Sequence, residues 1–223
     1  MSVQSSLIEL IRGKQMAQLF FRYGAMASGK SIEILKVAHN YETQGRQVLL
    51  LTSALDNRTQ VGEIASRIGL TRPAEAINET DNLFDLINEQ RSDIAAVLID
   101  EAQFMTKTQV LQLAQVVDEL GIPVLTFGLK NDAFNQLFPG SEALLIYADK
   151  IEEMKTLCSF CGRKATMNLR LSDGQPVYEG EQVQIGGDDS YLPVCRYHYN
   201  HPDLAALAKR VTPKSFLNEI RDK

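Results

Sequence analysis

The chain has 223 residues, enough for one substantial α/β core and a small appendage. It carries 23 Lys and Arg against 28 Asp and Glu, a net charge of −5, which argues against a surface for nucleic acid or for an anionic membrane. No apolar run approaches the roughly 20 residues that span a bilayer, and the N-terminus does not read as a signal peptide, so we expect a cytoplasmic protein.

The first elements in chain order follow an extension, residues 1–15, to which we assign no function. The apolar run 17–23 predicts a buried strand, and a glycine-rich turn comes directly after it. Helically spaced apolar residues then predict a helix that ends at Gly45. A second buried strand is predicted over 47–53, and the polar residues 56–82 are expected to hold a short helical stretch and a loop.

The next segments continue the alternation of helix and strand. We expect a helix over 83–90, a central parallel strand over 94–101, an amphipathic helix over 106–121 and a further strand over 122–128. This order is typical of right-handed βαβ units, which form a parallel sheet covered by helices on both faces. The sequence therefore predicts an α/β domain over residues 16–148.

The composition changes after residue 148. Short alternating stretches and many turn residues predict a small β-rich subdomain over 149–201. The remaining residues, 202–223, form a C-terminal tail whose beginning is expected to be helical.

Residues 24–31, GAMASGKS, satisfy the pattern G-x-x-x-x-G-K-[ST] between a predicted strand and a predicted helix. Small residues let successive backbone N–H groups point at a phosphate, and the helix N-terminus adds partial positive charge. Lys30 can reach the β and γ phosphates of ATP, and the Ser31 hydroxyl can bind Mg²⁺. The context disfavours a chance match, so we take the whole turn as the phosphate site: Gly24, Ala25, Met26, Ala27, Ser28, Gly29, Lys30 and Ser31.

Two carboxylates end the predicted central strand. Asp100 stands where an acid associated with Mg²⁺ is needed, and Glu101 follows it at the edge of the sheet where ligands of α/β folds bind. Glu101 could polarise water, as in an ATPase, or accept the proton of a substrate hydroxyl, as in a kinase. The string DEAQ also resembles a helicase motif, although a single core and an acidic surface oppose a helicase.

Three cysteines and one histidine form two close pairs in the last third of the chain. The spacings Cys158-x2-Cys161 and Cys195-x2-His198 predict a closed tetrahedral site for structural Zn²⁺, and they favour His198 over the nearby His201. The zinc would close a long loop between the two pairs. We expect this clamp to hold the loop and not the phosphate turn.

Several segments together resemble the zinc-containing (type II) thymidine kinases. They run in family order from about residue 17 to 200, and they read FFRYGAMASGKS, LLLTSALDNR, VLIDEAQF, PVLTFGLKNDAF, LCSFCGRKA and VQIGGDDSYLPVCRYHY. The last segment, a glycine-rich loop that ends in a zinc knuckle, is far more specific than the phosphate turn.

This resemblance implies a P-loop kinase core that transfers the γ-phosphoryl group of ATP to the 5′-hydroxyl of thymidine in nucleotide salvage. By the match, Glu101 is the proton acceptor, Lys30, Ser31 and Asp100 handle phosphates and Mg²⁺, and Arg58 and Gln103 join the ATP site. The implied thymidine site comprises Phe104, Leu129, Phe134, Val183, Ile185, Gly186, Gly187 and Tyr191, the last few in a loop that closes over the base.

Two departures from the family pattern concern Ala133, where an aromatic residue is common, and Ala27, where asparagine is common. The resemblance also implies a homotetramer that thymidine triphosphate inhibits. Two alternatives remain open from the residues alone: a P-loop ATPase that acts on nucleic acid or protein, and a zinc-ribbon binding module with a degenerate nucleotide fold.

Overall fold

A six-stranded parallel sheet forms the centre of the molecule. The computed structural model describes residues 17–56, 61–180, 182 and 190–204. Within them, the strand order of the sheet is β5-β2-β6-β7-β1-β8, and every neighbouring pair is parallel. The strands are β1 (Leu19–Tyr23), β2 (Gln47–Ser53), β5 (Glu75–Ile77), β6 (Ile94–Asp100), β7 (Val124–Gly128) and β8 (Lys150–Glu153).

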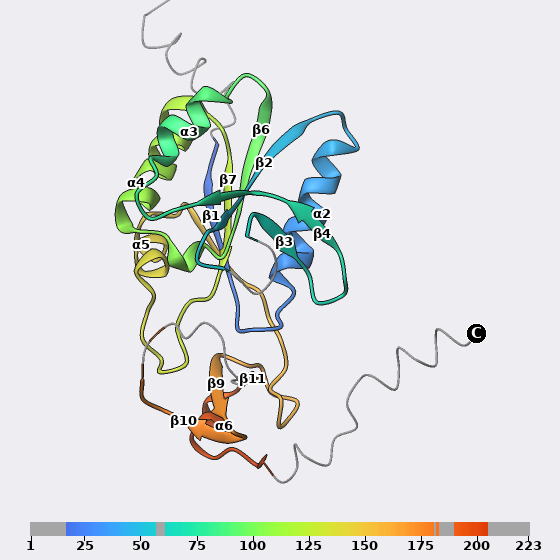
Figure 1. Ribbon diagram of the computed structural model, residues 1–223, viewed down its shortest axis with the longest axis vertical. Coiled ribbons are helices and arrows are strands. Elements are labelled where there is room, and N and C mark those ends of the chain that lie inside the picture. Colours follow the sequence, from blue (N-terminus) through green and yellow to red (C-terminus); the bar gives the residue numbers. More distant parts are fainter. Residues whose placement is uncertain (1–16, 57–60, 181, 183–189, 205–223) are drawn as a thin grey trace, which may run out of the picture.

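Helices cover both faces of this sheet, as the alternation of elements predicts. Helix α2 lies on one face, and α3, α4 and α5 lie on the other (Figure 1). The bounds are α2 (Lys30–Glu42), α3 (Leu83–Glu89), the short turn η1 (Ala102–Phe104), α4 (Lys107–Gln115), its π-helical continuation η2 (Val116–Leu120) and α5 (Pro139–Tyr147).

The central strand β6 sends successive side chains to opposite faces and buries all of them at its carboxyl end. Val97 and Ile99 pack in the cluster below α4 and α5, whereas Leu98 packs in the cluster below α2 with Phe127. A strand buried on both faces explains why this stretch reads as one continuous apolar run. The prediction of a central parallel strand is confirmed.

The helix predicted over 106–121 is present and begins at a capping box. The Thr106 hydroxyl accepts a hydrogen bond from the Gln109 backbone N–H (3.2 Å), and the Gln109 side chain accepts one from the Thr106 N–H (3.1 Å). Gly121 ends the helix in the left-handed conformation, with φ 67°. The local signals therefore place both ends correctly, and only the π-helical last turn was not expected.

The segment expected to hold a short helix between the second and third predicted strands forms strands instead. β3 (Glu63–Ala65) pairs antiparallel with β4 (Thr71–Pro73), and β5 joins the edge of the main sheet. Ser66 closes the β3–β4 hairpin because its Oγ accepts a hydrogen bond from the Leu70 N–H (3.0 Å) and donates one to the Leu70 carbonyl (3.1 Å). The helical prediction is thus wrong for the described part of this segment, since such short, half-exposed strands carry no clear apolar period.

A second, smaller unit lies beyond the carboxyl end of the sheet (Figure 1). It contains the antiparallel strands β10-β9-β11 and a short helix, with its own apolar cluster. The bounds are β9 (Met167–Ser172), β10 (Gln175–Val177), β11 (Ser190–Val194) and α6 (Arg196–Asn200). We call this unit, together with the loop that carries Cys158 and Cys161, the zinc subdomain.

The boundary between the two units differs from the position expected after residue 148. Strand β8 extends the main sheet beside β1, from the pair Phe20–Lys150 to the pair Tyr23–Glu153. The main sheet therefore takes its edge strand from a segment assigned to the small subdomain by sequence. Most of the tail 202–223 lies outside the described residues. None of the described helices is long and apolar enough to cross a membrane.

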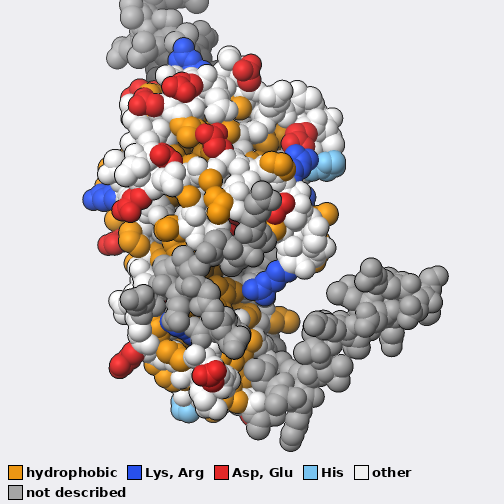
Figure 2. Space-filling view, in the orientation of Figure 1, with side chains coloured by type: hydrophobic (Ala, Val, Ile, Leu, Met, Phe, Trp, Pro, Cys, Tyr) orange, Lys and Arg blue, Asp and Glu red, His pale blue; other side chains and the backbone are white. Residues whose placement is uncertain are grey.

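The surface seen in Figure 2 mixes the two signs of charge. Described acidic and basic side chains are interspersed over this face, with apolar side chains between them. The face shown therefore has no extended region of one charge that would attract a partner of the opposite charge.

Candidate active site and metal cluster

The turn between β1 and α2, residues 24–31, adopts a compact loop with two left-handed residues. Ala27 has φ 57° and Gly29 has φ 83°. The left-handed region suits glycine and costs alanine a modest amount of strain. We call these eight residues the phosphate loop.

Gly24 begins the phosphate loop at a point that admits no side chain. A Cβ atom there would lie 2.4 Å from the Ser28 Oγ and 2.5 Å from the carbonyl oxygen of Met154. The Ser28 Oγ is itself buried and has no hydrogen-bond partner among the described residues. A buried hydroxyl left without a partner fits a loop whose polar groups are completed by a ligand.

Lys30 lies buried over the phosphate loop. Its ammonium group donates hydrogen bonds to the carbonyl oxygens of Gly24 (3.2 Å) and Ala25 (3.1 Å). These bonds hold the cation against the loop, where an anionic ligand would be attracted to it.

The phosphate loop lines a cavity of about 490 Å³, a volume suited to a nucleotide. Asp100 and Glu101 line it from the end of β6, and Leu129 lines it from beyond β7. The β3–β4 hairpin adds Arg67 to the same cavity. The loop motif and the two acids, 69 or more residues apart in the sequence, therefore share one site.

Glu101 occupies an unusual backbone position directly after β6. It is left-handed, with φ 53°, and its backbone N–H donates to the Asp100 Oδ1 (3.0 Å). Its side chain is only 6% exposed, and its Oε2 accepts a hydrogen bond of 2.5 Å from the Gln103 side-chain amide. A non-glycine residue held in this conformation beside a cavity is typical of a functional site.

Gln103 lies behind this carboxylate and not in the cavity. Its side chain is fully buried, and its Oε1 accepts a hydrogen bond from the Leu129 backbone N–H (3.0 Å). A Cβ atom at Gly128 would come within 2.7 Å of the same oxygen, so the glycine makes room for the amide. The sequence-based expectation placed Gln103 at ATP, whereas its contacts in the structure orient Glu101.

Asp100 is buried deeply enough to change its ionisation. Desolvation and the neighbouring Glu101 raise the pKa of the Asp100 carboxyl to about 7, although a hydrogen bond with Ser31 and the charge of Lys30 oppose this rise. A carboxylate and a hydroxyl in contact at the end of the phosphate loop are suitable oxygen ligands for a divalent cation. The residues present therefore fit Mg²⁺.

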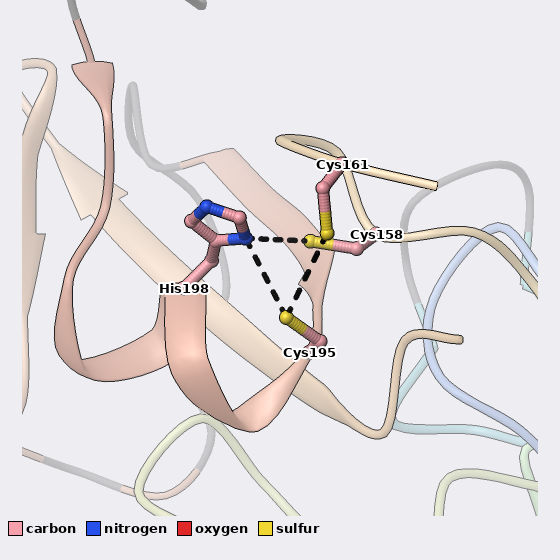
Figure 3. Close-up of side chains that lie close together, drawn as sticks. All are labelled: Cys158, Cys161, Cys195 and His198. Atoms are coloured by element: carbon pink, nitrogen blue, oxygen red, sulfur yellow. Dashed lines mark hydrogen bonds between the residues drawn. The ribbon is translucent and has the colours of Figure 1, made fainter. Parts of the chain in front are cut away.

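The predicted metal ligands converge on one point in the zinc subdomain (Figure 3). The His198 Nδ1 lies 3.5 Å from the Sγ atoms of both Cys158 and Cys195, and the Sγ atoms of Cys161 and Cys195 are 3.9 Å apart. All four ligand atoms lie within 4.8 Å of one another, as tetrahedral coordination of zinc requires. His198 completes this cluster, whereas His201 stacks on Tyr197 with 4.8 Å between ring centroids.

Within the cluster, the surroundings of Cys158 favour the thiolate form that a metal needs, whereas the neighbouring Cys158 and Cys195 help to raise the pKa of Cys161. Burial raises the pKa of the Cys158 thiol, but hydrogen bonds from the backbone around Cys195, Phe160 and Cys161 and from His198 outweigh it and lower this pKa to about 6. A Cys3His set without an open position is a structural zinc site.

The expected nucleoside residues are distributed over several places. Leu129 lines the cavity of the phosphate loop, whereas Phe104 lines a separate cavity of about 160 Å³ and packs edge-on against Phe138, with 5.7 Å between ring centroids. Phe134 lies near Gly180, and Tyr191 is on β11 opposite Arg170. The remaining expected residues lie outside the described part of the chain: Arg58, Val183, Ile185, Gly186 and Gly187.

The zinc subdomain contacts the phosphate loop, which the sequence analysis did not anticipate. The Asn168 Oδ1 accepts a hydrogen bond from the Met26 backbone N–H (2.8 Å), and the Thr156 hydroxyl donates to the Ala27 carbonyl (3.2 Å). The expectation that the clamp holds its own loop and not the phosphate turn did not include these contacts, and it stays a prediction. No motif signals these contacts, because Met26 and Asn168 are 142 residues apart and become neighbours only in the folded chain.

A larger cleft of about 920 Å³ lies beside the metal cluster and holds none of the phosphate-binding motifs. Lys130, Arg163 and Arg196 line it together with one metal ligand, Cys195. Cavity size alone thus does not identify the active site, whereas the convergence of a cationic loop with two buried acids does.

The fold and the site define a P-loop α/β protein with a Cys3His metal cluster, a class in which a glycine-rich loop binds nucleotide phosphates. The family model described as "Thymidine kinase" matches residues 17–199. The chain belongs to the thymidine kinase family, and it is an ATP-dependent kinase.

Curated relatives agree with this family. The chain is 65% identical over 197 residues to a thymidine kinase of Lactobacillus acidophilus, covering 85% of this chain and 99% of the relative. It is 66% identical over 187 residues to a thymidine kinase of Lactiplantibacillus plantarum, covering 84% and 97%. A solved Pif1 helicase from Candida albicans reaches a TM-score of 0.39 at 13% identity over 73% of this chain and 41% of the helicase, which is too low to carry an argument.

We expect Asp100→Asn to stabilise the protein at alkaline pH while it impairs the cation site. Because the pKa of Asp100 is raised on folding, the folded state binds more protons than the unfolded state between about pH 4 and 7, and stability falls as pH rises through this window. Asparagine does not ionise, so the variant avoids this fall in stability. Its free energy of unfolding at pH 8 should exceed that of the parent by roughly 1–3 kcal/mol. Urea unfolding at pH 5 and pH 8 without nucleotide or Mg²⁺ measures the difference.

The matched control for this prediction is Asp118→Asn, which changes an exposed carboxylate on η2. It should leave the pH dependence of unfolding as in the parent protein. Equal pH slopes for the parent and Asp100→Asn would contradict a raised Asp100 pKa.

Zinc content should depend on the cysteines and not on His201. The parent should bind about one zinc ion per chain, and Cys161→Ser should lose most of it because a structural site needs all four ligands. His201→Ala is the control and should retain the metal. Elemental analysis of the purified proteins measures both, and full zinc occupancy in Cys161→Ser would exclude the proposed ligand set.

Proposed function

We propose that the chain transfers the γ-phosphoryl group of ATP to the 5′-hydroxyl of thymidine and yields thymidine monophosphate. The observation that carries this proposal is the position of Glu101, which faces the cavity of the phosphate loop beside Asp100. In this reaction the hydroxyl oxygen bonds to the γ-phosphorus, the bond to the β–γ bridging oxygen breaks, and ADP leaves. The family membership supports thymidine as the acceptor.

The phosphate loop and Lys30 would bind the β and γ phosphates through backbone N–H groups and one buried cation. Ser31 and Asp100 would hold Mg²⁺, which neutralises developing charge on the phosphates when it is bound. Arg58 would add a further cation near the phosphates, by resemblance to the family. A loose transition state needs such charge neutralisation and an aligned hydroxyl more than it needs a strong base.

Glu101 would accept the proton of the 5′-hydroxyl. One oxygen of its carboxylate accepts a hydrogen bond from the Gln103 amide, and this bond limits the rotation of the carboxylate. We propose Gln103 as a positioning residue for Glu101, since it has no exposed surface with which to touch ATP.

The nucleoside would bind between Leu129 and the loop that carries Val183, Ile185, Gly186, Gly187 and Tyr191, with Phe104 and Phe134 along the base pocket. Structural zinc would hold the base of this loop. We further propose that the protein is cytoplasmic, as the sequence predicts, and that it is a homotetramer inhibited by thymidine triphosphate. The last two properties rest on resemblance to the family alone.

The function is tested by a screen of nucleosides as phosphoryl acceptors from ATP and Mg²⁺, run beside an ATPase assay with DNA and RNA. We expect thymidine monophosphate to form and nucleic acid to have no effect on ATP hydrolysis. Hydrolysis that responds to nucleic acid and ignores nucleosides would favour a motor ATPase instead.

Glu101→Gln should lower kcat by roughly 10²–10⁴, because it removes the proton acceptor but retains the shape of the side chain. ATP affinity should stay within about twofold, since the phosphate contacts are unchanged. Single-turnover formation of thymidine monophosphate measures the chemical step. Near-normal turnover in this variant would remove the assigned role.

Gln103→Met should lower kcat about tenfold while the KM for ATP changes little, because the Glu101 carboxylate loses its orienting hydrogen bond. The methionine nearly matches the glutamine in volume, and thermal unfolding shows whether the variant is folded. If Gln103 instead bound ATP directly, the KM for ATP would rise and kcat would be retained.

A further inference from the structure

We propose that Asn168 is a positioning residue through which the zinc subdomain holds the phosphate loop in the conformation that binds ATP. This inference rests on the proposed role of residues 24–31 in phosphate binding. It makes the metal cluster a determinant of the ATP site and not of the nucleoside loop alone.

Asn168 lies on β9 with 3% of its surface exposed. Its Oδ1 accepts the hydrogen bond from the Met26 N–H (2.8 Å), while its Nδ2 donates to the Asn131 carbonyl (3.5 Å). Only the carbonyl oxygen of an amide accepts a hydrogen bond from a backbone N–H, so the two partners together define which way the amide points. The side chain therefore spans from the zinc subdomain to the middle of the phosphate loop.

The metal cluster fixes the strand that carries Asn168. Met167 on β9 pairs with Val194 on β11, and Cys195 follows Val194 directly. The Thr166 N–H also donates to the Val194 carbonyl (2.9 Å). Five residue pairs join β11 to β9, and zinc bound by Cys195, Cys158 and Cys161 would restrain the end of β11 that pairs one residue away from Asn168.

Two other residues near the phosphate loop precede the metal cluster in sequence and do not lie on β9. Met154 follows β8, and its N–H donates to the Tyr23 carbonyl (2.7 Å) at the edge of the main sheet. Thr156, which contacts Ala27, comes two residues later. Met154 is therefore held by the sheet, whereas Thr156 lies two residues before Cys158 and its carbonyl accepts a hydrogen bond from the Ala165 N–H (2.9 Å). Asn168 is the contact to the phosphate loop that comes from β9 itself.

The bond to Met26 restricts the part of the phosphate loop that is hardest to order. Ala27 and Gly29, one and three residues after Met26, are both left-handed, and the orientation of the Met26 peptide limits the paths that the chain can take into them. A loop held in its binding conformation loses less freedom when the ligand binds. Loss of one such hydrogen bond should weaken ATP binding about 5- to 20-fold.

The first test compares variants of the full zinc-loaded chain by ATP titration and by hydrogen exchange of the Met26 amide. Asn168→Leu removes both hydrogen bonds, so we expect the 5- to 20-fold loss of ATP affinity and faster exchange at Met26. Asn168→Asp keeps the acceptor and should keep Met26 protected. Tyr178→Phe is the control, since it removes the hydrogen bond to the Tyr199 carbonyl within the zinc subdomain and should leave ATP affinity unchanged.

The second test removes zinc with a chelator from the parent and from Asn168→Leu. In the parent, zinc loss should weaken ATP binding and expose the Met26 amide. In the variant, zinc loss should weaken ATP binding less than it does in the parent, because the Asn168 connection is already broken. Thermal unfolding shows which samples stay folded. If Asn168→Leu does not fold, hydrogen exchange of the Met26 amide in the zinc-free parent tests the inference in its place.

Three results would overturn the inference: Asn168→Leu binds ATP as tightly as the parent does, zinc removal lowers ATP affinity equally in the parent and in Asn168→Leu, or the Met26 amide stays protected from exchange in the zinc-free parent. Lys30→Ala separates this failure from a failure of the proposed function. Unchanged ATP affinity in Lys30→Ala would refute the phosphate loop itself, whereas a loss there together with a normal Asn168→Leu would refute only the role of Asn168.

Discussion

The structure depends on one electrostatic arrangement, in which two buried carboxylates at the end of β6 face a cationic loop at the end of β1. Both strands pair with β7, so their carboxyl ends lie on either side of Gly128. The Gly24 N–H donates to the Gly128 carbonyl (3.2 Å), which ties the phosphate loop to the strand between the two charges. Two parallel strands on either side of β7 therefore bring Lys30 near Asp100, although the two residues are far apart in sequence.

This arrangement lowers stability in order to create a site. Asp100 is kept away from water, Glu101 and Ala27 are left-handed, and the Ser28 hydroxyl is buried without a partner among the described residues. Each of these features costs free energy in the ligand-free protein. The apolar clusters on both faces of the sheet stabilise the strands from which the site is built, so the strain remains local.

The zinc subdomain supports this site from outside the sheet. Its three short strands enclose a small apolar cluster, and a unit of this size commonly needs a metal or disulfides to stay folded. The contact between Asn168 and Met26 makes its folded state relevant to the phosphate loop as well as to the loop between its two zinc-binding pairs. Through this contact, a metal bound in the zinc subdomain can influence phosphate binding although it does not contact the phosphate loop.

The sequence by itself determined the features whose signals are local: the phosphate loop, the acids that end β6, the capped helix α4 and the four metal ligands. Each is encoded by residues a few positions apart, where spacing and backbone geometry are linked directly. Only the tertiary structure decided that β8 completes the main sheet, that residues 63–73 form a hairpin, that Gln103 orients Glu101, and that Asn168 holds Met26. These features arise from strand pairing and from buried hydrogen bonds, several between distant parts of the chain, which the local pattern of apolar and polar residues does not record.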